Sequence, residues 1–169
     1  KAGAVFDVKK LRWMNSMYAK KLSADEFYNY VKPYILQSGI VIQDETFAKA
    51  IINLVRDSVE VAPDISEIVA PYFAPFSFEN EAAQALVQLD ESKILFKKII
   101  EKLSEIDQLN TENFKEVMKQ VQTETGFKGK QLWMPYRAGF TGREHGADIS
   151  SLSVIFGKEE IIKRLKQHI

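Results

Sequence analysis

Helix-start residues followed by apolar residues at three-to-four spacing recur along nearly the whole chain, and this pattern limits the fold most. Apolar residues at that spacing form one face of an amphipathic helix. A preceding Ser, Thr, Asp or Asn can cap its first turn. The predicted helix starts are Asp7, Ser23, Asp44, Asp64, Ser92 and Thr111. Ser23 and Asp64 are each followed three residues later by a glutamate, which is the capping-box pattern. With no convincing strand pairs, the sequence predicts an all-α protein.

Residues 71–78 break the helical pattern with two prolines and four aromatic residues. We expect an extended connector there whose aromatic side chains are packed down. The connector divides the chain into an N-terminal helical subdomain, residues 1–78, and a C-terminal one, residues 79–169. Pro33 predicts a kinked or shortened helix, and Gly126 a helix end, while a final helix is expected after Gly157.

The segment Gly129–Gly142 combines glycines, a proline, three aromatic residues, a lysine and a single arginine. Glycine and proline interrupt regular backbone, and an arginine can bind a phosphate or stack on a base. We interpret the segment as a partly irregular structure that holds Arg137 and Thr141 against a ligand. The alternative is that Leu132, Trp133 and Phe140 are core residues and Arg137 is a surface charge. For Leu132, Trp133 and Trp13 we predict a place in the core.

The net charge is zero, but it is unevenly distributed along the chain. Residues 1–21 contain six basic residues and one acidic, residues 22–127 nine basic and eighteen acidic, and residues 128–169 eight basic and four acidic. Basic ends around an acidic middle can draw a polyanion to particular regions. The same asymmetry also arises by chance in solvated helix faces.

No catalytic motif is visible. The chain has no cysteine, which excludes disulfides and thiol chemistry and fits the cytosol. A phosphate-binding loop and a dinucleotide fingerprint are absent, and the spacing of His145 and His168 supports no metal site. A triad built on His145 stays open, although no serine lies in a nucleophile elbow. No apolar run is long enough to span a membrane, and no secretory pattern is visible.

Three segments together resemble the bacterial-type glutamyl-tRNA synthetases. Residues 6–18 resemble the family pattern F-D-x-x-K-L-x-W-x-N-x-x-Y, which follows the K-M-S-K-S loop of the catalytic half. Residues 130–142 resemble K-x-L-[FWM]-x-P-[LIV]-R-x-A-[LF]-T-G, and residues 152–159 resemble the closing pattern L-x-x-[LI]-[LF]-G-[KR]-E. The segments stand in the family's order and at its approximate spacing, so the resemblance covers essentially the whole chain.

The resemblance implies an anticodon-binding region made of two consecutive small helical bundles. The H-I-G-H signature and nucleotide fold of the family would lie upstream of Lys1, which would coincide with the end of the K-M-S-K-S loop or sit just past it. The expected parent enzyme is a cytoplasmic, monomeric glutamate–tRNA ligase that uses ATP and magnesium. This chain alone is expected to be non-catalytic, without metal or cofactor. Its implied partner is tRNA(Glu), with tRNA(Gln) left open.

Arg137 and Thr141 match the family's anticodon-contacting segment, and we expect phosphate contacts from Lys128, Lys130, Arg143 and Arg12. The chain departs from the family pattern at Tyr136, Gly139 and Ala147. Where the family has alanine, Gly139 is expected to loosen the helix by roughly 1 kcal/mol. A helical protein-interaction module with incidental basic ends is the alternative function.

Overall fold

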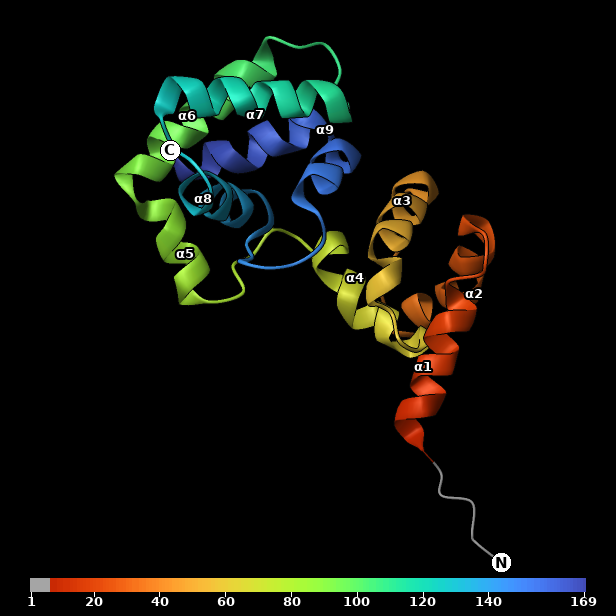
Figure 1. Ribbon diagram of the computed structural model, residues 1–169. Coiled ribbons are helices and arrows are strands. Elements are labelled where there is room, and N and C mark those ends of the chain that lie inside the picture. The colour runs from red at the N-terminus through yellow and green to blue at the C-terminus, as the bar shows by residue number, and fades with distance from the viewer. Residues whose placement is uncertain (1–6) are drawn as a thin grey trace, which may run out of the picture. The chain divides into compact units, whose positions relative to one another are not determined.

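The protein is described by a computed structural model that covers residues 7–169 (Figure 1). Within these residues every regular element is a helix, which confirms the predicted all-α class. Phe6, where the first family motif begins, and Lys1 both lie outside the described residues. The chain forms two compact units, Lys1–Ala74 and Pro75–Ile169.

The first unit is built by helices whose starts are fixed by side-chain caps. Asp7, Ser23 and Asp44 each accept a hydrogen bond from the first turn that follows, and Ser23 and Glu26 form the predicted capping box. Phe27 and Ile65 are among the residues that fill its core with no exposed surface. The helices are α1 (Val8–Ala19), α2 (Ala24–Gln37), α3 (Glu45–Val55) and α4 (Ile65–Phe73), with 3-10 turns at Arg56–Ser58 and Ala62–Asp64.

Two local predictions for this unit are wrong. Asp64 does not cap α4, because its carboxylate instead accepts hydrogen bonds from the Val61 amide at 3.4 Å and from Arg12 at 2.9 Å. The connector also begins later than predicted, since α4 continues through Pro71 to Phe73. Of the two outcomes predicted at Pro33, a kink or a shortened helix, the second is not observed, because α2 runs through the proline to Gln37.

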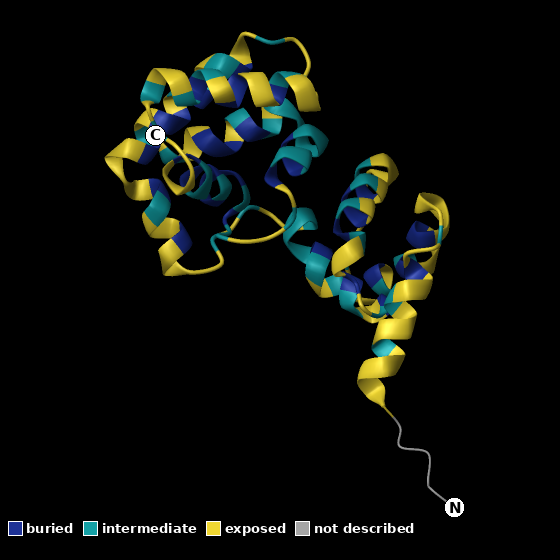
Figure 2. Ribbon diagram, in the orientation of Figure 1, coloured by how far each residue is buried: buried dark blue, intermediate teal, exposed yellow. Residues whose placement is uncertain are grey.

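Helix α1 leaves its apolar side exposed, as Figure 2 shows for most of its length. Trp13 is 61% exposed, so its predicted place in the core is wrong within this structure. The helix is held at its C-terminal end, where Ala19 is buried and the Arg56 guanidinium donates to the carbonyls of Ala19 and Leu22. The periodicity of α1 therefore marks an amphipathic helix correctly, but its apolar side packs against little else in the described residues.

The second unit consists of α5 (Glu81–Gln88), α6 (Asp90–Ser104), α7 (Thr111–Thr125), α8 (Lys130–Thr141), α9 (Ile149–Leu165) and a 3-10 turn at Lys166–His168. Gly126 ends α7 with a φ of 75°, as predicted, and Gly157 (φ 80°, ψ 161°) breaks the helical backbone within α9. Ser92 does not open a helix: it lies inside α6, where its hydroxyl donates to the Leu86 carbonyl.

An aromatic core holds the second unit together. Phe96, Phe114, Tyr136 and Phe140 are fully buried, and the Tyr136 and Phe140 rings stack with centroids 5.8 Å apart. The Tyr136 hydroxyl lies 2.7 Å from Ser153 Oγ. Burial raises the pKa of Tyr136 well above that of an exposed phenol. The hydroxyl is therefore a neutral structural group that links α8 to α9.

Candidate nucleic-acid interface

The glycine-containing segment from 129 to 142 is not irregular, which corrects the sequence interpretation. It forms the continuous helix α8, with a glycine at each end. Gly129 precedes the helix at φ 51° and Gly142 ends it at φ 73°, and glycine adopts both values without the strain that a Cβ brings. The prolines and glycines of the segment therefore set the limits of a helix and the closeness of its packing.

Close packing also explains Gly139, which faces the buried core of the second unit. A Cβ built there would lie 2.8 Å from Phe96 Cζ and 3.0 Å from Leu165 Cδ2. The expectation that glycine merely weakens this helix relative to alanine is incomplete, because the space of the methyl group is occupied by neighbouring side chains. Gly142 is held still more tightly, with the Ser77 carbonyl oxygen 2.0 Å from its ideal Cβ position.

Arg137 and Thr141 shape the C-terminal end of α8 and the loop that follows. Arg137 is half-buried, and its Nη1 donates to the Ala147 carbonyl at 2.9 Å. The Thr141 hydroxyl donates to the Arg137 carbonyl at 2.8 Å and accepts from the Arg143 amide at 3.3 Å. The structure thus brings the two predicted residues together, one turn of helix apart, at a braced loop.

The opposite side of this loop, residues 142–148, is fastened by Glu79. Its carboxylate accepts from the Glu144 amide at 2.6 Å and from Arg143 Nη1 at 3.4 Å. The Glu79 amide in turn donates to the Gly142 carbonyl at 2.9 Å. Arg143, a predicted phosphate contact, is therefore partly neutralised by a carboxylate within the second unit.

Lys128 and Lys130 lie exposed on either side of Gly129, where α8 begins. No ion pair is formed by either lysine with the described part of the chain. The start of a helix also carries partial positive charge from its backbone amides. Of the predicted site residues, these two lysines are the most accessible cations for a polyanion.

Arg12 is placed in the first unit and is occupied by carboxylates. Its Nε and Nη2 lie 2.9 Å from oxygens of Glu60 and Asp64, respectively. The hydrogen bond to Glu60, together with the charge of Asp64, raises the pKa of Arg12. A phosphate at Arg12 would have to compete with both carboxylates.

A shallow hollow between α7, α8 and the start of α9 was missed by sequence reasoning. Trp133 lines it in a half-buried position, which only partly fulfils the core prediction, whereas Leu132 is buried as expected. Lys115 and Lys119 stand at its edge, one turn apart on α7. Their spacing with Gln122 marks a polar stripe in the sequence, but nothing local indicates that Trp133 lies next to it.

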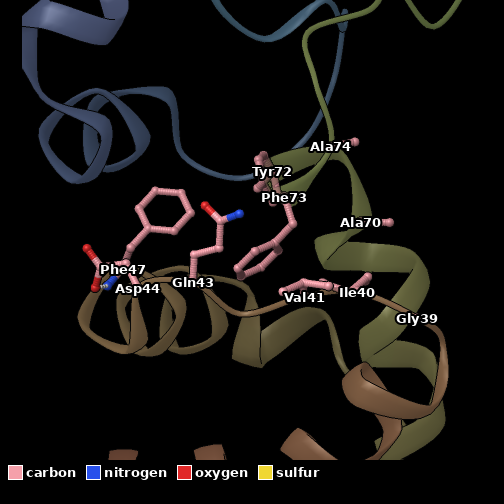
Figure 3. Close-up of a pocket in the computed structure, with 10 residues that line it drawn as sticks. All are labelled: Gly39, Ile40, Val41, Gln43, Asp44, Phe47, Ala70, Tyr72, Phe73 and Ala74. Atoms are coloured by element: carbon pink, nitrogen blue, oxygen red, sulfur yellow. Dashed lines mark hydrogen bonds between the residues drawn. The ribbon is translucent and has the colours of Figure 1, made fainter.

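A larger hollow in the first unit has a different character (Figure 3). Figure 3 shows the aromatic side chains of Phe47 and Phe73 on its walls, and their ring centroids are 5.7 Å apart. Asp44 is its one charged lining residue, and that carboxylate caps α3. Lacking a cation, this hollow is poorly suited to bind a polyanion. The full lining is Gly39, Ile40, Val41, Gln43, Asp44, Phe47, Ala70, Tyr72, Phe73 and Ala74.

Two further features concern the kind of protein. Across residues 7–169, no group of three or more His, Cys, Asp or Glu side chains could hold a metal ion. None of the helices in this range is long and apolar enough to cross a membrane.

The second unit is an all-helical domain that exposes lysines at the start of α8 and along α7. Residues 26–169 match the family described as "Anticodon binding domain", and the chain belongs to this family. The resemblance inferred from the three sequence motifs is thereby confirmed.

The similar proteins are glutamate–tRNA ligases. The chain is 34% identical to the glutamate–tRNA ligase of Finegoldia magna, over 99% of this chain and 34% of the relative. It is 31% identical to that of Bacillus subtilis, over 98% of this chain and 35% of the relative. A crystal structure of a glutamate tRNA ligase from Elizabethkingia meningosepticum superposes with a TM-score of 0.81 and 27% identity, over 99% of this chain and 33% of that structure. The chain thus spans about a third of the length of these relatives.

Proposed function

We propose that the chain is the tRNA-anticodon-recognition region of a glutamate–tRNA ligase, which attaches glutamate to tRNA(Glu) with ATP. The observation that carries this proposal is the family match over residues 26–169, combined with relatives that are glutamate–tRNA ligases along essentially the whole chain. In the proposed parent enzyme the chain binds tRNA, and ATP and magnesium act in the catalytic part.

The geometry supports an RNA-binding role for the second unit. An anticodon loop offers unstacked bases and flanking phosphates, which proteins bind with aromatic planes, arginine and lysine. Lys128 and Lys130 are exposed at the start of α8, and Arg137 and Thr141 lie on the same helix beside a braced loop. Helix α8 holds Lys130, Arg137 and Thr141, and Lys128 lies just before its first turn.

The proposal is tested by binding of the purified chain to a tRNA(Glu) transcript and to an unrelated tRNA at several salt concentrations. Affinity is expected to fall as salt rises, by about −0.7 in logarithmic slope per phosphate neutralised if single-stranded contacts dominate. Replacing Lys128 and Lys130 together by alanine is expected to flatten the slope, because these lysines form no ion pair in the described residues. Salt-independent binding would favour a protein-interaction module instead, whereas equal, salt-dependent binding of both tRNAs would leave RNA binding but contradict recognition of the anticodon.

Arg137 distinguishes base recognition from loop support. If its guanidinium reads an anticodon base, Arg137→Ala should weaken cognate binding by roughly 1–3 kcal/mol and lose less on a tRNA altered at that base. Arg137→Lys should stay impaired, since lysine restores charge but neither stacking nor the fork of donors. Because Arg137 donates to the Ala147 carbonyl, thermal unfolding must be measured in parallel. A lower melting temperature with unchanged affinity per folded molecule would make Arg137 structural.

Three finer features belong to the same proposal. Whether tRNA(Gln) is also bound is decided by repeating the binding assay with that tRNA.

We further propose a cytoplasmic, monomeric parent enzyme, in which residues 1–78 follow the catalytic half and residues 79–169 contact the anticodon. The isolated chain should show no glutamate-dependent ATP–pyrophosphate exchange, and exchange above a blank would contradict this assignment.

A further inference from the structure

The hollow on the second unit combines an aromatic wall with a basic edge. It has a volume of about 310 Å³ and is lined by Phe114, Lys115, Met118, Lys119, Gln122, Trp133 and Ser150. This volume is at the lower end of the range for small-ligand pockets. The lining comes from three helices, so its shape is set by packing within one compact unit (Figure 1).

The aromatic wall is supported by the core of the second unit. The Trp133 ring lies 6.4 Å from the Phe114 ring and 6.3 Å from the Tyr136 ring, centroid to centroid. Phe114 and Tyr136 are fully buried, so Trp133 is supported from the core while it remains half-buried itself. A supported indole at a surface hollow is a preformed plane on which a flat ring can stack at little entropic cost.

The basic edge is open to solvent. Lys115 and Lys119 are exposed and form no ion pair with residues 7–169, unlike Lys98 and Lys102, which are paired with Glu124. Two unpaired ammonium groups one helical turn apart attract a phosphate, and the salt dependence of such contacts is strong. Gln122, the next residue of this stripe, adds an amide that can donate or accept a hydrogen bond.

We propose that this hollow binds one unstacked nucleotide of the tRNA loop, with its base against Trp133 and an adjacent phosphate at Lys115 and Lys119. The inference rests on the proposed function and adds a subsite to it. Single-strand binding sites combine these two elements, an aromatic stacking plane and a basic edge along the backbone. Stacking accepts any base, so the subsite contributes affinity and no discrimination between anticodons.

The subsite adjoins the braced loop through Ser150. Ser150 lies in the first turn of α9, two residues after Asp148, which caps that helix by accepting from the Ser151 amide at 2.7 Å. The Ala147 carbonyl, one residue earlier, is the acceptor of Arg137. Trp133 and Arg137 are four residues apart on α8 and therefore lie on one side of it. A nucleotide at Trp133 is thus a neighbour of any nucleotide at Arg137.

The direct test uses Trp133 as its own reporter. The chain has two tryptophans, so Trp13→Phe leaves Trp133 as the only one. The probe is an RNA hairpin with the anticodon loop of tRNA(Glu), compared with a blunt duplex of the same stem. We expect the hairpin to change the Trp133 fluorescence, since a base stacks on the indole, and the duplex to leave it unchanged.

Affinity measurements complete the test. Lys115→Ala with Lys119→Ala, and separately Trp133→Leu, should each weaken hairpin binding by about tenfold, whereas Trp133→Phe should retain most of the affinity. Lys97→Ala, which removes an exposed lysine of α6 outside the hollow, is the matched control and should change little. The same losses are expected on a hairpin with an altered anticodon.

The outcomes separate the subsite from the proposed function. Tight hairpin binding with unchanged Trp133 fluorescence and no effect of the lysine variants would overturn the subsite and leave anticodon binding intact. If the variants lost affinity only for the hairpin with the cognate anticodon, the proposal that the subsite accepts any base would be overturned. Failure of the chain to bind either the hairpin or tRNA(Glu) would refute the proposed function and the subsite with it. The lysine variants alter only exposed positions, so their effect on binding does not depend on a change in folding.

Discussion

The substitution Gly139→Ala should have two opposing effects on stability, one from helix propensity and one from core packing. Alanine stabilises a helix interior by about 1 kcal/mol relative to glycine. At this position, however, the new methyl group would meet Phe96 Cζ at 2.8 Å and Leu165 Cδ2 at 3.0 Å. Both neighbours have no exposed surface and cannot turn outward into solvent. Overpacking of this kind costs roughly 1–3 kcal/mol, so we expect a net destabilisation of about 1 kcal/mol.

The assay is thermal unfolding of the chain, followed by Trp133 fluorescence in the Trp13→Phe background. Trp133 packs on the core of the second unit, so its signal reports that unit. For a unit of this size, 1 kcal/mol corresponds to a shift of roughly 4–8 °C in melting temperature. Phe96→Leu, which removes the nearest ring carbons, is the partner variant for a double-mutant cycle.

In the Phe96→Leu background, Gly139→Ala should become neutral or stabilising, because the methyl group then has room. A stabilisation of about 1 kcal/mol by Gly139→Ala alone would show that helix propensity decides at this position. The packing argument would then be wrong. If Gly139→Ala changed the unfolding free energy by the same amount with Phe96 and with Leu at position 96, Phe96 would not be the cause of the destabilisation.

Three other predictions concern the same unit. Tyr136→Phe should cost about 1 kcal/mol in unfolding free energy, since Ser153 keeps its bond to a helix carbonyl but loses the buried phenol. Burial lowers the pKa of His168, so folding stability present above pH about 6.5 should decline as pH falls below that value. His168→Gln should remove that decline between pH 5.5 and 7, and His145→Gln, at an exposed loop position, should not. Gly126→Ala should destabilise by about 1 kcal/mol because of its φ of 75°, with Gly126→Asn milder, as measured by thermal unfolding.

Helix starts were predictable where the signal is local. Asp7, Ser23 and Asp44 cap the helices that follow them, and Gly126 ends α7. Capping depends only on residues within one turn, so the sequence contains all of its causes. The prediction that Asp64 caps a helix was wrong because Arg12, from a helix distant in the sequence, binds its carboxylate.

The prolines show why interruptions of the helical backbone were misjudged. Pro33, Pro71 and Pro135 all lie inside helices, although a proline cannot donate to the carbonyl four residues earlier. Those carbonyls belong to residues 29, 67 and 131, all of which are exposed, so water can replace the lost donor. Whether an acceptor is exposed depends on tertiary packing, and the sequence does not display it.

In the candidate site, too, local features could be predicted from the sequence and features that depend on packing could not. The sequence identified α8 as the informative segment, and the family resemblance pointed to Arg137 and Thr141. It did not reveal the hollow at Trp133, because that hollow requires α7 and α9 to be placed beside α8. Trp13 was assigned to the core from its residue type and is exposed instead.

The arginines and lysines of the predicted site have different surroundings. Arg12 and Arg143 are paired with carboxylates, and Arg137 donates to a backbone carbonyl. Lys128 and Lys130 project into solvent without an ion pair in residues 7–169. A guanidinium has a fixed fork of donors that suits the bracing of a loop, whereas an ammonium on a flexible stem suits contact with a mobile phosphate.

This division has a measurable consequence for RNA binding. Phosphate contacts made by the exposed lysines should carry most of the salt dependence, so removing them should flatten the slope without changing the melting temperature. Removing Arg143 should instead lower the melting temperature, because Glu79 would lose its ion-pair partner and keep only the Glu144 amide within the loop. If Arg143→Ala flattened the salt slope as strongly as the two lysine substitutions while leaving stability unchanged, the arginine would be a phosphate ligand. The carboxylate contact at 3.4 Å would then be an arrangement of the RNA-free protein that a phosphate displaces.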